Sequence, residues 1–200
     1  MKIIAIGMNY PLHCKELHAG EPLPQEPVIF MKPDSALLKD SKPFFIPDFC
    51  QQVDYETELV VRINRLGKNI SERFAHRYYD AVTVGIDFTA RDLQRKFRAE
   101  GKPWELCKGF DNSAAIGDWV PVEKFADIQH INFHLDIDGK TVQQGKYAGH
   151  AFQSRPDYCI RQSVLYIENW RYAVYRNTGR SGSGTDRQSL GRLFGKRKSS

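Results

Sequence analysis

Several features that would decide the class of this protein at once are missing from its 200 residues. No apolar run approaches the roughly 18 residues that a membrane-spanning helix requires. The opening stretch MKIIAIGMNY is too short, and too soon interrupted, for a signal peptide. The four cysteines, Cys14, Cys50, Cys107 and Cys159, have no C-x-x-C spacing, which indicates neither a zinc knuckle nor a disulfide framework. We therefore expect a cytoplasmic protein with reduced, mostly buried thiols and no membrane partner.

Internal repeats are also absent, and no low-complexity segment precedes residue 178. This absence excludes a repeat architecture for the main body of the chain. Hydrophobic residues make up 41% of the sequence and aromatic residues 12%, which is enough for a sizeable core. We expect one principal domain.

An excess of basic residues is absent from most of the chain, although its net charge is +5. Residues 1–145 hold 18 Lys and Arg against 21 Asp and Glu, whereas residues 146–200 hold 11 against 3. The chain is thus an acidic body with a basic tail, so we do not expect the body to bind nucleic acid. The alternative from another class is a non-enzymatic protein whose tail, with Lys196, Arg197 and Lys198, binds nucleic acid or acidic partners. Such binding would weaken steeply with salt.

Three carboxylates mark the stretch from residue 53 to residue 108 as the most informative part of the sequence. The segment VDYETELVVRI is rich in β-branched and aromatic residues and predicts a strand, on which Glu56 and Glu58 share one face. Asp87 ends a second apolar run over residues 81–87. Neighbouring carboxylates repel unless a cation lies between them, and three hard oxygen ligands suit Mg²⁺ or Mn²⁺ better than zinc. The alternative is the ordinary solvated face of a half-buried sheet.

Two further groups have the chemistry of an active site. Pro11 suits the first turn of a short helix on which His13 and Glu16, three residues apart, face the same way. A Glu that orients a His is a common general base, although an exposed pair has the same spacing. Lys108 follows two apolar residues and could point toward the carboxylates, where it would stabilise developing negative charge. A lone Lys is more often solvated.

The remaining pattern predicts a mixed, mainly β fold with few helices. Strands are expected over residues 3–6 and 28–33, a helix over residues 71–79 begun by Ser71, and a hairpin over residues 131–142 that turns at Asp138-Gly139. Residues 18–27 contain three prolines and two acids, which indicates a loop or lid. The strand–helix–strand passage up to residue 87 permits a crossover connection.

The motifs GIDFTARDLQ, GKPW and KGFD, preceded by YETEL, together resemble the signature of the fumarylacetoacetate hydrolase family. The resemblance covers residues 1 to about 145. It implies a rolled, mixed β-sheet (the family's β-sandwich roll) with short peripheral helices, and usually a homodimer. It also implies one Mg²⁺ or Mn²⁺ per site, held by Glu56, Glu58 and Asp87.

The same resemblance implies roles for the other candidate residues. In the family, a His-x-x-Glu matching His13 and Glu16 activates water, and the residue matching Lys108 holds an oxyanion. Substrate contacts are implied for Gln94 and for Asn9, within the family's Gly-x-Asn-Tyr. Met8 stands where many members have Arg, so any substrate contact of that Arg is not expected here. The segment matching residues 18–27 closes over the substrate.

The implied substrate is a small 2-oxo acid, because a metal can chelate an α-keto acid and act as a Lewis acid on its enolate. We expect Mg²⁺-dependent hydrolysis of the C–C bond of acylpyruvates such as fumarylpyruvate or acetylpyruvate. The alternatives are decarboxylation of oxaloacetate and isomerisation of 2-hydroxyhepta-2,4-diene-1,7-dioate. The sequence does not separate the three, because all need the same metal and enolate.

The resemblance ends near Gly145, where the charge of the chain also changes. With suitably chosen codons read one base later, residues 145–154 become ENTQDMLFK and residues 175–184 become TGTPEGVGP, which match a helix start and a Thr-Gly-Thr-Pro motif of the family. One extra A in the codons of Gly145 and Lys146 would explain both.

We therefore expect an incomplete catalytic domain over residues 1–145. The basic tail over residues 146–200 would be frameshifted and poorly packed, with the C-terminal strands of the fold missing or garbled.

Overall fold

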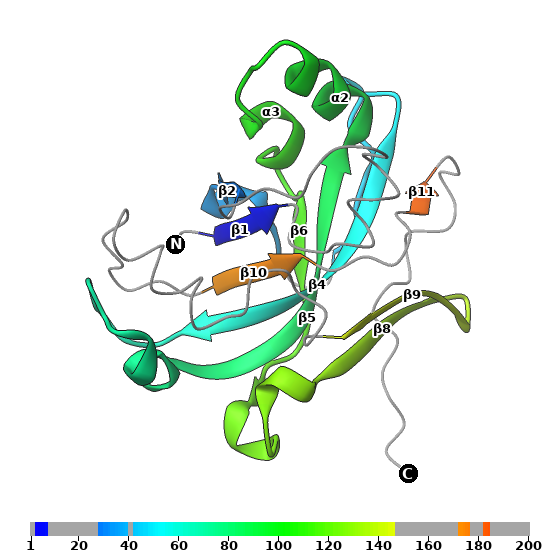
Figure 1. Ribbon diagram of the computed structural model, residues 1–200. Coiled ribbons are helices and arrows are strands. Elements are labelled where there is room, and N and C mark those ends of the chain that lie inside the picture. Colours follow the sequence, from blue (N-terminus) through cyan, green and yellow to red (C-terminus); the bar gives the residue numbers. More distant parts are fainter. Residues whose placement is uncertain (1–2, 8–27, 40–41, 147–171, 177–181, 185–200) are drawn as a thin grey trace.

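The computed structural model describes residues 3–7, 28–39, 42–146, 172–176 and 182–184. Most of the described elements are strands, which form one strongly twisted sheet with a separate hairpin beside it (Figure 1). The strands are β1 (Ile3–Gly7), β2 (Val28–Lys32), β3 (Leu37–Leu38), β4 (Val53–Ile63), β5 (Tyr79–Ala90), β6 (Ala114–Ile116), β7 (Val120–Pro121), β8 (Asn132–Ile137), β9 (Lys140–Lys146), β10 (Tyr172–Arg176) and β11 (Gly182–Gly184).

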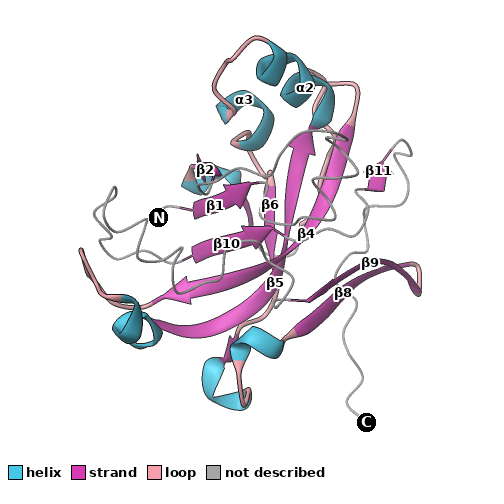
Figure 2. Ribbon diagram, in the orientation of Figure 1, coloured by secondary structure: helices cyan, strands magenta, loops and turns pink. Residues whose placement is uncertain are grey.

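Helices are few and lie at the margins of the sheet (Figure 2). The α-helices α2 (Arg91–Ala99) and α3 (Glu105–Lys108) follow β5 at one end of the sheet, and the 3₁₀ helices are η1 (Asp34–Ala36), η2 (Glu72–Arg77), η3 (Val122–Lys124) and η4 (Ile128–His130). The helix predicted after Ser71 is η2. Ser71 occupies its N-cap position, but its hydroxyl makes no capping hydrogen bond.

The long strands β4 and β5 are the centre of the sheet, whose order is β2-β1-β10-β4-β5-β6-β3. They pair antiparallel along almost their whole length, with Glu56 directly opposite Asp87. This pairing excludes a crossover between them. The sheet is nevertheless mixed, because β1 pairs parallel with β10 and β3 pairs parallel with β6. The predicted mixed, mainly β fold is confirmed.

Both faces of the central strands are buried. On one face of β4, Leu59 and Val61 pack in a cluster with Ile4 and Ile6 of β1. On the other face, Val60 packs with Ile3 and Ala5. Side chains of a strand alternate between its faces, so Glu56 and Glu58 lie on the same face as Val60. They point into the molecule, not into solvent.

The predicted hairpin is formed by β8 and β9, which lie beneath β4 and β5 in the view of Figure 1. Its turn is made by Asp138 and Gly139, with φ values of 50° and 77°. Both values lie in the left-handed region that favours Asp-Gly in tight hairpins. Phe133 and Leu135 of β8 are buried against two different core clusters, and they fasten the hairpin to the sheet.

Two segments of the basic tail take part in the sheet. The strand β10 pairs with β1 and β4, and β11 pairs with the start of β4. We predicted missing or garbled strands here, and the two that the structure describes are short. Strand pairing uses backbone groups, which any residue except proline provides in full. That the tail is read out of frame stays a prediction.

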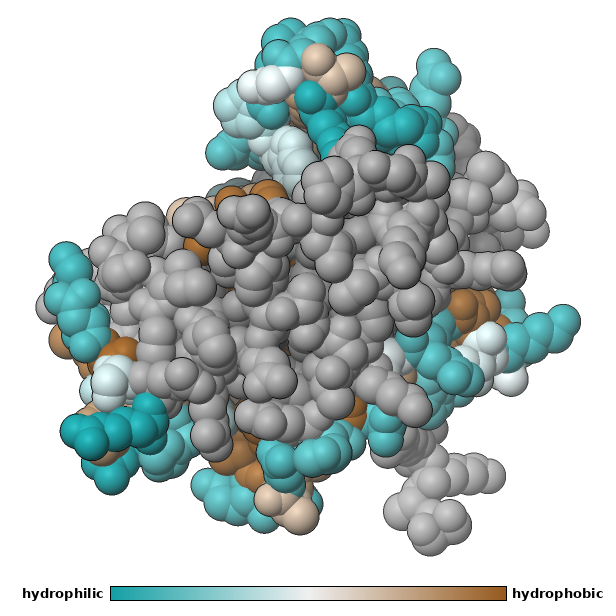
Figure 3. Space-filling view, in the orientation of Figure 1, coloured by the Kyte–Doolittle hydropathy of each residue, from teal (hydrophilic) through white to brown (hydrophobic). Residues whose placement is uncertain are grey.

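The described helices are all too short and too polar to cross a bilayer. In the space-filling view, hydrophilic residues cover most of the helical end of the molecule (Figure 3). This agrees with the sequence of α2, RDLQRKFRA, whose five charged residues include four cations.

Candidate metal centre

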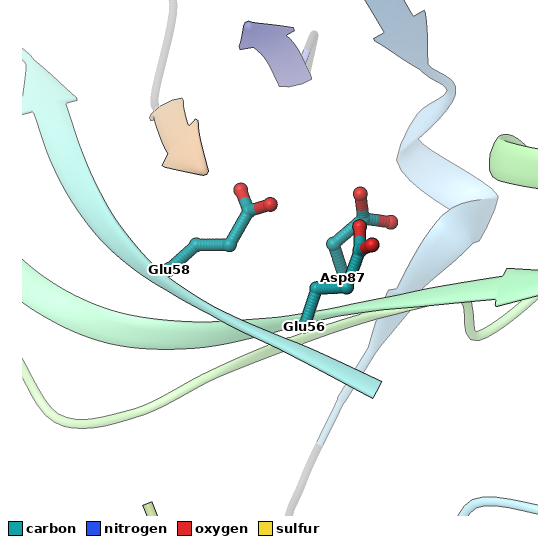
Figure 4. A group of neighbouring side chains, drawn as sticks. All are labelled: Glu56, Glu58 and Asp87. Carbon is teal, nitrogen blue, oxygen red and sulfur yellow. The ribbon is translucent and has the colours of Figure 1, made fainter. Parts of the chain in front are cut away.

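The carboxylates of Glu56, Glu58 and Asp87 lie together over the central strands (Figure 4). Each offers an oxygen atom, and these three atoms lie within 4.8 Å of one another. All three residues are at most 1% exposed, which is wrong for a solvated sheet face. The pairing of β4 with β5 brings them together, because it sets Asp87 opposite Glu56 and leaves Glu58 two residues along the same face.

Buried like charges on opposed strands destabilise a sheet unless cations compensate them. Lys108, at the end of α3, is the first such cation. Its Nζ is 2.7 Å from Glu56 Oε2 and 2.5 Å from Asp87 Oδ2, and it also donates to the hydroxyl of Thr89. The ammonium lies 5.2 Å from the centre of the Phe30 ring, a distance at which a cation–π contact contributes. Lys108 is therefore part of the carboxylate cluster.

Lys32, the last residue of β2, is the second buried cation. Its Nζ lies 2.7 Å from Asp87 Oδ1 and donates to the hydroxyl and the backbone carbonyl of Ser113, both at 3.0 Å, and to the carbonyl of Lys108. Burial is the largest influence on this group and lowers the pKa of Lys32, while Asp87 raises that pKa and Lys108 lowers it. Lys32 thus joins β2, β5 and the end of α3 at the carboxylates.

Arg91, the first residue of α2, supports the cluster from its other side. Its guanidinium pairs with Glu56 and, at 2.7 Å, with Asp54. These two carboxylates raise the pKa of Arg91 against the opposing effect of burial, so the group is charged. Arg91 also donates to Oε1 of Gln94, one turn along the helix. Gln94, predicted to contact substrate, is thus linked to Glu56 through Arg91.

The donor set fits a small hard cation. Three buried carboxylates are the ligands that Mg²⁺ and Mn²⁺ prefer, and no soft ligand lies in the group. The described residues therefore provide a candidate site of the predicted kind, from the three predicted residues. An ion there would approach oxygens that Lys108 and Lys32 also contact.

Four of the eight residues predicted from the sequence meet in this cluster: Glu56, Glu58, Asp87 and Lys108. Gln94 reaches it through Arg91. Three others, Asn9, His13 and Glu16, lie outside the described residues, as does the predicted lid over residues 18–27. Their roles, like those of the clustered residues, stay predictions.

Sequence reasoning missed Lys32 and Arg91. A Lys that ends an apolar strand before a proline looks like an ordinary strand terminus, and no local signal marks it as buried. Arg91 lies within the motif GIDFTARDLQ, but the sequence does not say that it pairs with two acids of another strand.

Comparison with known proteins adds an independent observation. A family model described as fumarylacetoacetate (FAA) hydrolase C-terminal matches residues 2–156. The oxaloacetate tautomerase YcgM of Escherichia coli is 36% identical over 148 residues, which are 74% of this chain and 67% of that protein. A mitochondrial oxaloacetate decarboxylase of Dictyostelium discoideum is 35% identical over 145 residues, 72% of this chain and 66% of that one.

Among solved structures, the fumarylpyruvate hydrolase of Pseudomonas aeruginosa in complex with Mn²⁺ and pyruvate resembles this chain with a TM-score of 0.78. The two are 26% identical, and the likeness covers 88% of this chain and 76% of the other. The arrangement of strands described above is therefore shared with a protein that binds Mn²⁺.

Proposed function

Because the chain belongs to the fumarylacetoacetate hydrolase family, we propose that it is a divalent-metal-dependent enzyme whose reaction is the keto–enol tautomerisation of oxaloacetate. The observation that carries the proposal is the cluster of three buried carboxylates in contact with the ammonium of Lys108. The choice of oxaloacetate rests on the tautomerase and the decarboxylase named above, which are 36% and 35% identical to this chain.

Glu56, Glu58 and Asp87 would hold the metal. A bound Mg²⁺ or Mn²⁺ supplies Lewis-acid polarisation of the 2-oxo group. The positive charge of Lys108 would stabilise the negative charge that this oxygen gains as the neighbouring carbon passes its proton to a base such as water. Arg91 and Lys32 hold Glu56 and Asp87 in place while the charge moves. Tautomerisation moves one proton from carbon to oxygen, or back, and breaks no C–C bond.

Hydrolysis of an acylpyruvate is the second candidate, favoured by the likeness to the fumarylpyruvate hydrolase. Both reactions pass through an enolate, but hydrolysis also needs an activated water to attack the distal carbonyl. The predicted base is His13 with Glu16. The substitution His13→Ala should therefore abolish a hydrolase, whereas it should leave part of a tautomerase activity that depends on Lys108.

The test measures the decay of enol-oxaloacetate by its ultraviolet absorbance and the release of pyruvate from fumarylpyruvate, each with Mg²⁺ and with a chelator. We expect metal-dependent decay of the enol faster than in buffer. A larger metal-dependent effect on pyruvate release would identify the hydrolase instead. Rates equal to buffer for both substrates, from this chain and from its version without the extra base, both binding metal, would exclude both reactions.

The substitution Glu58→Gln tests the metal assignment, because it keeps the volume of the side chain and removes the charge. We expect enol decay to fall by at least about 100-fold, since second-sphere changes alone commonly cost 10–100-fold. The matched control is Glu105→Gln, an exposed residue at the start of α3. Activity of Glu58→Gln near that of the control would show that the carboxylate is not a ligand.

A further inference from the structure

The strand that carries Glu56 and Glu58 is paired continuously on one edge and discontinuously on the other. Toward β5, every residue from Val53 to Ile63 has a partner. On the opposite edge, β11 is in register with residues 53–55 and β10 with residues 58–61. Among the strand residues that the structure describes, none is in register with Glu56 or Thr57 on that edge. The break in pairing thus includes one predicted metal ligand, Glu56, and ends at the other, Glu58.

Gln143 of β9 fills this break. Its Oε1 accepts a hydrogen bond from the backbone N–H of Thr57 at 2.8 Å and another from the Thr57 hydroxyl, and its Nε2 donates to the backbone carbonyl of Tyr55 at 2.9 Å. Residues 55 and 57 direct their backbone groups to the same edge of the strand, because alternate residues do so. The side-chain amide thus makes the two bonds that a neighbouring strand would make on either side of Glu56.

The approach of Gln143 is separate from the carboxylates. Thr57 alternates with Glu56 and Glu58, so its hydroxyl lies on the other face of the sheet. Gln143 is 3% exposed and is paired on the hairpin with Leu135, which is buried against the cluster containing Phe88. The amide is therefore buried and held by a hairpin that is itself packed on the sheet.

We propose that Gln143 is a positioning residue for the metal centre: its amide bonds the backbone on both sides of Glu56, at a point where neither β10 nor β11 is in register with that residue, and so fixes Glu56 relative to Glu58. The proposal rests on the proposed metal-dependent function. Two ligands on one strand bind one ion well only if the backbone that joins them is held to a fraction of an ångström. At this point of β4, neither β10 nor β11 is in register to hold that edge, and Gln143 does so instead.

Only an amide side chain meets this requirement. Leu at position 143 would remove the acceptor of the buried N–H of Thr57 and one donor to the half-buried carbonyl of Tyr55, and the strand could then bend locally to reach other partners. Glu would keep the acceptor for Thr57 but lose the donor for Tyr55, and it would add negative charge behind the carboxylates. Gln144 is the natural control, because it is the next residue of β9 and its side chain is exposed.

The competing role is purely structural, with Gln143 only fastening the hairpin to the sheet. The two roles differ in metal affinity. A fastener affects the melting temperature of the metal-free protein, whereas a positioning residue also changes the dissociation constant for the ion in the molecules that remain folded.

The experiment titrates the full chain with Mn²⁺, using the paramagnetic resonance signal of free Mn²⁺, and compares wild type, Gln143→Leu, Gln143→Glu and Gln144→Leu. The melting temperature of each metal-free protein is recorded as well. We expect the dissociation constant to rise about tenfold or more for Gln143→Leu, as for other supporting residues of metal sites. Gln144→Leu should match wild type.

The dissociation constant of Gln143→Glu is judged by the same criterion, and this variant replaces Gln143→Leu if the latter does not fold. A folded Gln143 variant with a dissociation constant within about twofold of wild type, whatever its melting temperature, would overturn the proposal, since supporting residues of metal sites typically change affinity by 10–100-fold. A wild-type chain that binds no Mn²⁺ would instead overturn the proposed function together with it. Binding by wild type without turnover of any 2-oxo acid would contradict only the proposed reaction.

Discussion

At the scale of single residues, buried lysines stabilise the carboxylate cluster, because their charges compensate the carboxylates as solvent would at the surface. Lys32 contacts Asp87, Ser113 and the backbone of Lys108, all within the core. The substitution Lys32→Met leaves the volume nearly unchanged but removes a cation from Asp87. We expect the free energy of unfolding to fall by about 3 kcal/mol, because the buried cluster loses one of its cations and Asp87 keeps only its contact with Lys108.

Urea denaturation of the metal-free protein measures this loss, with Lys39→Met as the control on an exposed lysine. Equal stability of the two variants would contradict the ion pair. Added Mg²⁺ should restore part of the stability of Lys32→Met, because the ion supplies positive charge to the same carboxylate.

Cys107 gives a residue-scale prediction of pH dependence. Burial is the main cause that raises the pKa of this thiol to about 11, with Asp87 adding to the rise and Lys108 opposing it. The unfolded chain releases this proton near the ordinary thiol pKa of 9.0, before the folded chain does. Stability from this group is therefore complete below about pH 9 and is lost as the pH rises toward 11, by about 2–3 kcal/mol in total.

Denaturation of wild type and Cys107→Ala between pH 8 and pH 11 isolates this contribution. The wild-type curve should fall more steeply above pH 9 than that of the variant. The thiol should also react slowly with an aromatic disulfide at pH 8 until the protein unfolds. Rapid reaction of native Cys107 would contradict its burial.

How far the sequence predicts the site also depends on the type of residue. Glu56, Glu58 and Asp87 could be found because three acids on apolar strands conflict with the ordinary composition of a core. Gln143 could not be found, because Gln next to Val142 on a short strand looks the same whether it is exposed or buried. Its role depends on a break in pairing between strands distant in sequence, which no local pattern records.

At the scale of the elements, the close contact of the central strands with β6 depends on Gly85. A Cβ at this position would lie 2.7 Å from Val60 Cγ2 and 2.8 Å from the carbonyl oxygen of Ala115. We expect Gly85→Ala to lower the free energy of unfolding by about 1–3 kcal/mol, the usual cost of overpacking a core. It should also weaken metal binding, because Gly85 lies opposite Glu58.

The double variant Gly85→Ala, Val60→Ala separates the two contacts. It relieves the side-chain contact but leaves the backbone carbonyl of Ala115, which cannot move without disturbing the pairing of β5 and β6. Thermal unfolding should show that Gly85→Ala lowers the melting temperature almost as much in the Val60→Ala protein as in wild type. A double variant as stable as Val60→Ala alone would mean that the strands can separate at this point.

Elements with strong local patterns were predicted well, and those without them were not. The strands β1, β2 and β4 and the β8–β9 hairpin have apolar runs or turn residues that mark them. The helix α2 was missed, although Leu93 and Phe97 share one face, because Ala90 at its N-cap supplies no capping side chain. The pairing order β1-β10-β4 was also beyond prediction, since it joins strands from opposite ends of the chain.

At the scale of the whole molecule, we propose that the tail is displaced by one base, as expected from the sequence. The family match ends at residue 156, soon after the suspected extra A. With suitably chosen codons, the match in the shifted frame also extends upstream of the Thr-Gly-Thr-Pro motif. Residues 170–175, WRYAVY, can be encoded as TGG CGA TAT GCA GTA TAC. Read one base later and continued into the codon of Arg176, this string gives GDMQY directly before TGTPEGVGP, so the family's Gly-Asp precedes its Thr-Gly-Thr-Pro.

We expect a chain without the extra base to be more soluble than the 200-residue chain and to have at least about tenfold higher enol-oxaloacetate turnover, since completing a site commonly changes activity by that much. Size-exclusion chromatography and the enol assay measure the two effects. A second gene that encodes the same frame-restored protein with different synonymous codons should give the same solubility and the same turnover. A gene whose sequence is confirmed as written, and whose 200-residue product is fully active, would contradict the proposed displacement of the tail.

The positions of the clustered residues along the chain have a consequence for biosynthesis. Glu56, Asp87 and Lys108 all leave the ribosome well before the tail, and domains generally begin to fold from the N-terminal side during synthesis. The β4–β5 ribbon and its internal ion pairs can therefore form on the nascent chain. The edge of β4 that accepts β10 stays uncovered until residues 172–176 have been made, more than 60 residues after Lys108, so the ligands are in place before the strand that pairs with that edge exists.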